Sequence, residues 1–174
     1  MPKRLPWLAW LMSIATAAHG DDGGAHLESC RELRNSDPAR ALPACEAAAP
    51  ALAVATRPDE AFEAWMHAAQ LASQLGQPER AEAAADRGAE LLGRVSDPLA
   101  AQRLARRRAL VAYRDQRPVE ALQHFLEALA AARAAADPAA ISISENDLGV
   151  AYRHLGDLPE ALRHFDASLQ LKES

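Results

Sequence analysis

The chain has 174 residues, enough for one domain, and a formal net charge of −5. Hydrophobic residues make up 49% and aromatic residues only 5%. This composition argues against a β-sandwich, which needs β-branched and aromatic residues, and it favours close-packed helices rich in Ala and Leu. The acidic balance argues against nonspecific binding to nucleic acid, which needs a basic surface.

The segment 1–20 has the layout of a secretory signal peptide. Lys3 and Arg4 give a positive start, and a mostly apolar run follows at 5–18. A membrane anchor is the alternative, but this run is shorter than the stretch of about 20 apolar residues that a helix needs to span a membrane. We therefore predict cleavage near Gly20 and a mature chain without a membrane span that is periplasmic or secreted.

Residues 21–57 are predicted to form a disordered N-terminus and a degenerate first helical hairpin. The segment 21–25 (DDGGA) is polar and rich in Gly, which is typical of a disordered end. Helical spacing follows at 26–34, a turn at 35–38 and a second helix at 39–49.

Cys30 and Cys45 are the two cysteines of the chain. An even pair in an exported protein favours a disulfide, and a bond between residues 15 apart (45 − 30) stabilises by about 3 kcal/mol in the chain-entropy model. Two buried free thiols are the alternative. A metal site would need more ligands than these two and His26, so no metal is expected.

The rest of the chain repeats with a period of about 40 residues, a size that predicts stacked helical hairpins. Ala81, Ala121 and Ala161 are equally spaced (121 − 81 = 161 − 121 = 40), and EALQHF at 120–125 recurs as EALRHF at 160–165. The predicted array of three repeats covers 58–96, 97–136 and 137–174.

The last repeat, 137–174, shows the hairpin pattern most clearly. Its hallmark positions are Leu148, Gly149, Tyr152, Gly156, Ala161, Phe165 and Ser168. Matching positions earlier in the chain are Trp65, Gly76, Ala81, Ala121 and Phe125. This pattern resembles the tetratricopeptide repeat (TPR) family, well over 58–172 and weakly over 26–50, as found in exported bacterial proteins. The resemblance implies an all-α fold, an α/α solenoid of about four helix-turn-helix repeats.

The resemblance also assigns structural roles. Small residues such as Ala121 and Ala161 lie where two helices cross closely, and Phe125 and Phe165 fill the gap between hairpins. If 26–49 is a first hairpin, its facing helices bring Cys30 and Cys45 together.

In TPR proteins the first helices of the hairpins line a concave binding face. Carried over by position, the peptide-binding groove consists of Met66, Gln70, Ser73, Arg107, Arg114, Asn146 and Arg153. Arginine is suited to bidentate contacts with carboxylates, so an acidic or C-terminal peptide is a conceivable partner. The Lys-Asn pair of TPR domains that clamp a terminal carboxylate is absent, since Met66 and Gln70 stand in its place.

A dense basic run consists of Arg103, Arg106, Arg107 and Arg108. It has two interpretations: a solvated face whose charges pair with nearby acids, or an anion contact in the groove. The sequence leaves both open.

No catalytic motif is found. The chain lacks a Gly-rich phosphate loop and the HExxH, CxxC and GxSxG patterns, so we expect no enzyme activity and no cofactor. The predicted function is a non-enzymatic scaffold or adaptor that binds an unknown protein or peptide outside the cytoplasm.

The end of the last repeat leaves a choice. TPR arrays usually finish with an extra polar helix, whereas this sequence stops with the second helix of its last hairpin. That helix tolerates exposure, or the chain forms a homodimer through this hairpin, or it is the sensory part of a longer membrane signalling protein of the diguanylate cyclase or histidine kinase type.

Overall fold

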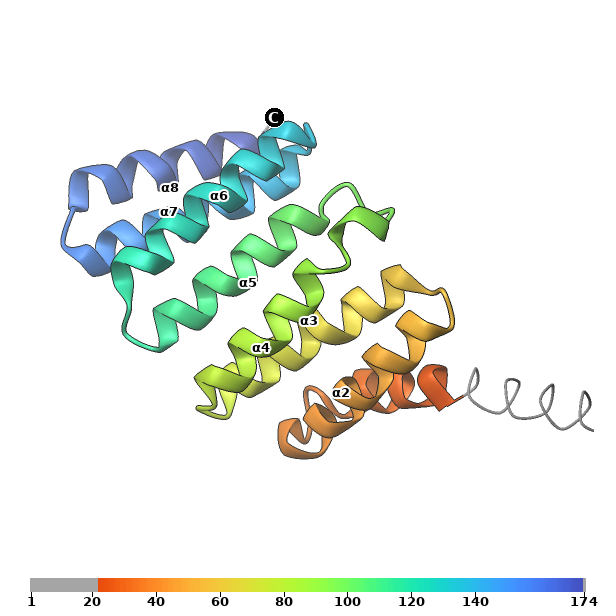
Figure 1. Cartoon of the computed structure of the whole chain (residues 1–174). Helices are drawn as coiled ribbons and strands as arrows, with labels where there is room; N and C mark the ends of the chain where they lie inside the picture. The colour runs from red at the N-terminus through yellow and green to blue at the C-terminus, as the bar shows by residue number, and fades with distance from the viewer. Residues whose placement is uncertain (1–21, 174) are drawn as a thin grey trace, which may run out of the picture.

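The computed structural model describes residues 22–173, in which eight α-helices form paired hairpins that stack into a solenoid (Figure 1). The first helix covers residues 22–33. The others are α2 (Pro38–Val54), α3 (Pro58–Gln74), α4 (Pro78–Ala89), α5 (Ala100–Arg114), α6 (Pro118–Ala134), α7 (Pro138–Leu155) and α8 (Leu158–Glu173). The all-α solenoid prediction is confirmed. The signal peptide predicted at residues 1–20 lies outside the described residues.

Helices begin at regular intervals because proline marks their starts. Six helices in the described part have Pro in the first turn: Pro38, Pro58, Pro78, Pro118, Pro138 and Pro159. The missing N–H costs nothing there, and the fixed φ suits the first turn. Asp37 and Asp137 add side-chain caps, accepting from Arg40 N at 3.1 Å and Ala140 N at 2.8 Å.

Helix ends follow an equally regular pattern. Left-handed residues stand at Thr56, Gly76, Gln116, Ala136 and Gly156, with φ between 52° and 84°. Around each of them the chain closes with a bond that spans five residues, for example Arg117 N to Ala112 O at 2.9 Å and Asp157 N to Tyr152 O at 3.0 Å. This geometry reverses the chain after each helix with its last carbonyls satisfied.

The connection between α4 and α5 breaks the pattern. A short 3₁₀ helix, η1 (Leu92–Arg94), follows α4, and the chain then runs extended to α5. Asp97 and Pro98 precede this helix, and Asp97 accepts from Leu99 N at 2.9 Å. Ser96 anchors the loop, because its N–H and hydroxyl both donate to the Asp59 carboxylate, at 2.8 and 3.0 Å.

The N-terminal hairpin is more helical than the sequence suggested. Residues 22–25, predicted to be disordered, lie in the first helix. Gly23 allows this packing, since a Cβ there would lie 3.1 Å from Ala51 Cβ on α2. Helix α2 also continues past Pro43 and Pro50, although its end was expected at residue 49. Tertiary packing thus outweighs the local signals.

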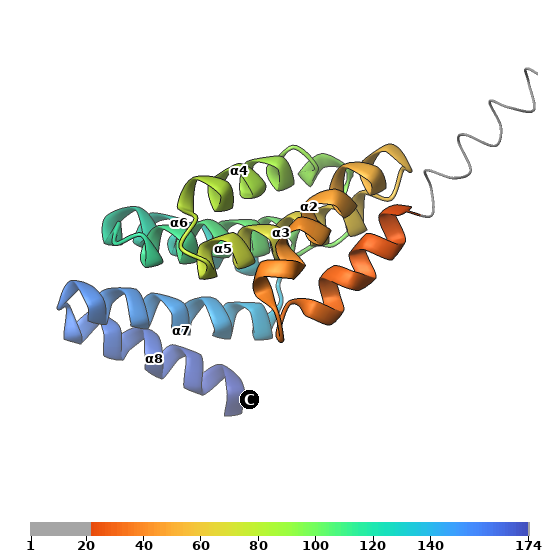
Figure 2. The same ribbon diagram turned by 90° about the horizontal axis from the view of Figure 1, so that it is seen from below.

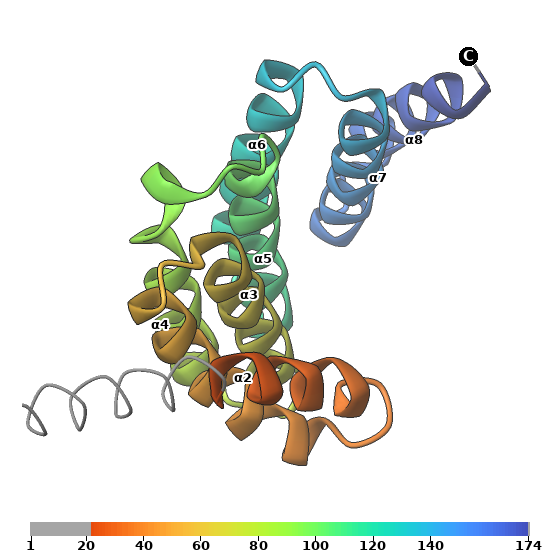
Figure 3. The same ribbon diagram turned by 90° about the vertical axis from the view of Figure 1, so that its right-hand side faces the viewer.

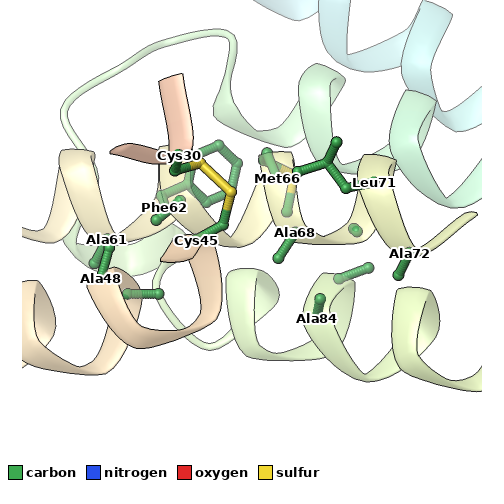
Figure 4. Close-up of a cluster of buried hydrophobic side chains, with 14 of the residues drawn as sticks. Cys30, Cys45, Ala48, Ala61, Phe62, Met66, Ala68, Leu71, Ala72 and Ala84 are labelled. Carbon is green, nitrogen blue, oxygen red and sulfur yellow. A yellow bond between two sulfur atoms is a disulfide. The ribbon is translucent and has the colours of Figure 1, made fainter. Parts of the chain in front are cut away.

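The predicted disulfide joins the two helices of this hairpin. Cys30 and Cys45 are bonded, with Cα atoms 5.0 Å apart, and both are fully buried. They belong to a cluster of buried side chains that continues through α3 and α4 into α5 and includes Phe62 (Figure 4). Phe62 was not among the residues singled out from the sequence, whereas Trp65 was, and Trp65 is only partly buried.

A second buried cluster lies between the last two hairpins. It contains Phe125, Leu129 and Leu148 together with Ala109, Ala112, Ala121 and Ala151. Figures 1 and 3 show the α7–α8 hairpin at the far end of the stack from the N-terminal hairpin, with α5 and α6 between them, and Figure 2 shows α7 and α8 side by side. Of the remaining repeat positions, Ala81, Ala161 and Gly149 are buried, Tyr152 and Phe165 are half-buried, and Gly76 and Gly156 are turn residues with positive φ.

Candidate binding groove

The first helices of the last three hairpins, α3, α5 and α7, carry a groove of about 360 Å³ on one face of the solenoid. We call it the α3–α5–α7 groove. The residues that line it include His67, Gln102, Arg103, Arg106, Arg107 and Ile143.

Two polar bridges fix α7 against α5 beside this groove. Arg106 Nε donates to Asp147 Oδ2 at 2.5 Å, and the buried Gln102 Nε2 donates to Ser144 Oγ at 3.3 Å. The donors are one helical turn apart on α5, and so are the acceptors on α7. These two contacts fix the position of α7 against α5 along the groove.

Three of the four clustered arginines on α5 have acidic partners. Arg103 binds Asp97 at 2.9 Å, Arg106 binds Asp147, and Arg108 binds Asp86 at 2.7 Å. The Arg103 guanidinium also lies 5.5 Å from the centre of the Phe62 ring, a cation–π distance. These three arginines agree with the first interpretation of the basic run, a face whose charges pair with nearby acids.

Arg107 differs from its neighbours. Its Nε–H is buried and has no hydrogen-bond partner among residues 22–173. Burial lowers the pKa of Arg107 to about 10, and the positive charges of Arg106, Arg114 and Arg103 contribute to this shift in that order of importance. The side chain stays charged at neutral pH, so the groove holds a cation with other arginines nearby and with Asp137 on the same lining.

His67 forms the α3 wall of the groove. Its Nε2 lies 3.2 Å from Glu63 Oε1 and 3.2 Å from Arg34 Nη1. Burial, followed by the positive charge of Arg34, lowers the pKa of His67, so the ring is neutral at pH 7. Glu63 is in turn held by Arg31, at 2.9 and 2.7 Å, a pairing that lowers the pKa of Glu63 and ties the N-terminal hairpin to α3.

The residues predicted to line one groove do not all lie together in the structure. Arg107 lies in the groove, and Met66 also lines it but is only 2% exposed. Met66 fills space beside Gly88, where a Cβ would lie 2.5 Å from Met66 Cε. Gln70 is half-buried on α3 and does not line the groove.

Ser73 and Arg114 meet at the other end of α3 and α5. Arg114 Nη1 donates to Ser73 Oγ at 3.4 Å, and both line a smaller pocket of about 200 Å³. Asn146 and Arg153 are exposed on α7 and line neither cavity.

The groove therefore lies about one helical turn nearer the start of α5 and α7 than predicted. His67, Gln102 and Ile143 were not predicted as groove residues. A usable signal was present for Ile143, because it precedes Asn146 by three residues and shares its helix face.

Another cavity, of about 280 Å³, lies between α4, α5 and α6. Its two arginines already have partners: Arg108 binds Asp86, and Arg117 binds Glu82, Asp115 and Glu120. It therefore offers no unpaired charge to a ligand. Over residues 22–173 no set of three or more His, Cys, Asp or Glu side chains could hold a metal ion, and no helix is long and apolar enough to cross a membrane.

Comparison with known proteins supports the repeat architecture. Residues 99–174 match the family model of the tetratricopeptide repeat. The crystal structure of BtubC (BKLC) from P. vanneervenii superposes with a TM-score of 0.75 at 19% identity, over 87% of this chain and 63% of that chain. Two crystal structures of MamA superpose with TM-scores of 0.53 and 0.52 at 15% identity, over 91% and 88% of this chain and 93% of each MamA chain. No curated protein sequence matches.

The family match and the similar structures indicate the structural class of this chain. The chain is an all-α protein of stacked helical hairpins whose residues 99–174 match the tetratricopeptide repeat model, and the same paired-helix architecture extends toward the N-terminus through α2. At 15–19% identity the solved structures establish the fold alone.

Proposed function

We propose that this protein is a non-enzymatic scaffold outside the cytoplasm that holds a partner protein or peptide in the α3–α5–α7 groove. The observation that carries the proposal is the groove itself, which three stacked hairpins build and polar bridges keep open. Ile143 gives it an apolar contact surface, since 45% of that side chain is exposed there. A preformed groove with apolar and polar groups is typical of a binding site.

The compartment is supported by the disulfide and the leader sequence. Disulfides persist in oxidising compartments and are rare in the cytosol. The Cys30–Cys45 bond is fully buried in the first core cluster, so it contributes to the fold rather than to surface redox chemistry. A periplasmic or secreted location accounts for both features.

Site-specific photo-crosslinking tests the groove. A benzoyl-phenylalanine placed at Ile143 should cross-link one discrete partner in the native host, which mass spectrometry then identifies. The control is the same residue at Val119, which is 66% exposed on α6 and does not line the groove. Equal cross-linking from both positions, or none from Ile143, would mean that the groove is not the binding face.

The intact mass of the protein isolated from its own host tests the location. We expect the mass of residues 21–174 less two hydrogens, which reports cleavage near Gly20 and the disulfide together. A mass that includes Met1 with two free thiols would contradict export.

Exposed leucines favour a second candidate. Leu162 and Leu169 on α8 are 62% and 54% exposed and share one helix face, so another helix can cover them. In this candidate the chain is the sensory part of a longer signalling protein. An intact mass well above that of residues 21–174 would support it, whereas light scattering at twice that mass would indicate a homodimer through the same hairpin.

A further inference from the structure

The unpaired Nε–H of Arg107 is the feature that the architecture leaves unexplained. This group is buried without a partner in the described part of the chain. A buried N–H donor without an acceptor opposes folding, so proteins normally pair such groups. A ligand that supplied the missing acceptor would remove this cost on binding.

Nearby acidic side chains are already engaged elsewhere. Asp147 binds Arg106, and Asp97 binds Arg103. Asp137 lines the same groove and caps α7 by accepting from Ala140 N through Oδ1, and it forms no ion pair with Arg107. Glu63 lies farther along α3 and binds Arg31 and His67. No carboxylate among residues 22–173 forms an ion pair with Arg107, so a carboxylate that pairs with it would come from outside the described residues.

The groove also determines the size and surroundings of the occupant. A volume of about 360 Å³ accommodates a few side chains and not a folded domain. Ile143, on the α7 wall, exposes apolar surface in the same groove as Arg107. One cation beside one apolar contact fits a carboxylate next to an apolar side chain.

We propose that Arg107 binds the side-chain carboxylate of an Asp or Glu in a partner segment, and that an apolar residue next to this acid packs on Ile143. This proposal rests on the proposed function, because it names what that groove recognises. Arginine and carboxylate form two parallel hydrogen bonds, which give both energy and geometric selectivity.

An internal acidic residue fits better than a chain terminus or a phosphate group. The α5 face continues past Arg107, where Arg114 and Asp115 line the next pocket, so a bound segment can extend in both directions. A phosphate carries close to two charges at neutral pH and is best held by several cations. Here Arg103 and Arg106 are already paired, which leaves a single cation for a single charge.

The test is an NMR titration of the full chain that follows the Arg107 Nε–H resonance. The probe is the blocked peptide acetyl-Gly-Leu-Glu-Leu-Gly-amide, used at up to roughly 10 mM to cover weak affinities. We expect a saturable shift with this peptide and none with its Gln analogue. No shift with the Glu peptide, or equal shifts with both peptides, would overturn the proposal.

Two further ligands test whether Arg107 binds a terminal carboxylate or a phosphate as well as a Glu side chain. The unblocked Gly-Leu-Gln-Leu-Gly supplies only a terminal carboxylate, and inorganic phosphate supplies only a phosphate. Each should bind at least tenfold more weakly than the blocked Glu peptide. If either binds as tightly, Arg107 recognises a terminus or any anion, and the proposal is wrong.

Arg107→Gln and Arg108→Gln form a matched pair of variants. Both remove one positive charge from adjacent positions on α5, but Arg108 faces Asp86 outside the groove. Arg107→Gln should weaken binding of the Glu peptide at least tenfold, and Arg108→Gln should change it by less than about twofold. Equal losses in both variants would reduce the effect to general electrostatics and overturn the assignment.

Thermal unfolding shows whether Arg107 is structural instead. Because the buried Nε–H has no partner, Arg107→Gln should leave the Tm unchanged or raise it. A fall of more than about 3 °C would identify a structural role and contradict the proposal. If Ile143 cross-links a partner and Arg107→Gln does not weaken that cross-link, the proposed function stands and only this inference fails.

Discussion

Helices α6 and α8 carry the same sequence pattern one repeat apart, yet they bury opposite members of it. In α6 Phe125 is 2% exposed while the His124 side chain is 21% exposed. In α8 His164 is 3% exposed and Phe165 is only half-buried. A repeated motif therefore repeats the helix but not the environment of each side chain.

The preceding helix explains why His164 is buried whereas His124 is partly exposed. The two hairpin turns are equivalent, because the closing bonds Arg117 N to Ala112 O and Asp157 N to Tyr152 O join positions one repeat apart. At equivalent positions α5 has Ala105 and Ala112 where α7 has Glu145 and Tyr152. Glu145 Oε2 lies 2.6 Å from His164 Nδ1, and the Tyr152 ring stacks on the imidazole at 5.2 Å. Helix α5 offers no such partner, and His124 contacts Glu127 of its own helix at 2.8 Å.

The following helix explains why Phe125 is buried whereas Phe165 is only half-buried. Helix α6 lies between α5 and α7, so Phe125 is covered from both sides and belongs to the second core cluster. Helix α8 packs against α7, and its outer face keeps Leu162 and Leu169 exposed. Stacking neighbours, rather than the motif, decide how much each repeat position contributes to stability.

The largest difference in the loss of unfolding free energy is expected between the alanine variants of Phe125 and Phe165. Phe125→Ala should lower the free energy of unfolding by about 3–5 kcal/mol, because it opens a cavity in a covered cluster. Phe165→Ala should cost roughly half as much, since part of that ring already faces solvent. Urea unfolding of both variants measures this difference. Equal losses would contradict the idea that α7 distinguishes the two positions.

Leu129 and Leu169 sharpen the same contrast. Leu129 is 5% exposed and Leu169, at the equivalent position one repeat later (129 + 40), is 54% exposed. Leu129→Ala should cost about 2–4 kcal/mol, and Leu169→Ala less than about 1 kcal/mol. A large loss for Leu169→Ala in urea unfolding would show that another chain covers α8 in solution.

The two histidine–glutamate contacts test the effect of burial. Glu145→Ala removes the buried acceptor of His164 and should cost roughly 2–3 kcal/mol. The matched control is Glu127→Ala, which breaks the exposed contact with His124 and should cost less than about 1 kcal/mol. The double variant Glu145→Ala with His164→Ala should lose less than the sum of the single variants, measured as a double-mutant cycle. Additive losses would mean that the two side chains do not interact.

The smallest expected effect concerns Gly149, which makes room for Phe165. A Cβ at this position would lie 2.5 Å from Phe165 Cε1. Gly149→Ala should cost about 1–2 kcal/mol, because the clash exceeds the gain in helix propensity. In the Phe165→Ala background the same change should be neutral or stabilising. Destabilisation in both backgrounds would show that something other than the Phe165 ring limits the site.

The helices and turns of this protein follow from its local sequence. Six helices have proline in the first turn, and turns with a left-handed residue recur between them, so the hairpins and their period could be predicted. The Cys30–Cys45 pairing was also predictable from two cysteines in one hairpin. These signals depend on neighbours a few residues away, which the sequence displays directly.

The candidate site, in contrast, depends on contacts between helices. Arg106, Arg107 and Arg108 are consecutive in sequence, but each successive residue of an α-helix is rotated by about 100°, so they face α7, the groove and α4. Which of them finds a carboxylate depends on the side chains of those other helices. The groove and its unpaired arginine therefore arise from the packing of helices distant in sequence, which no local pattern records.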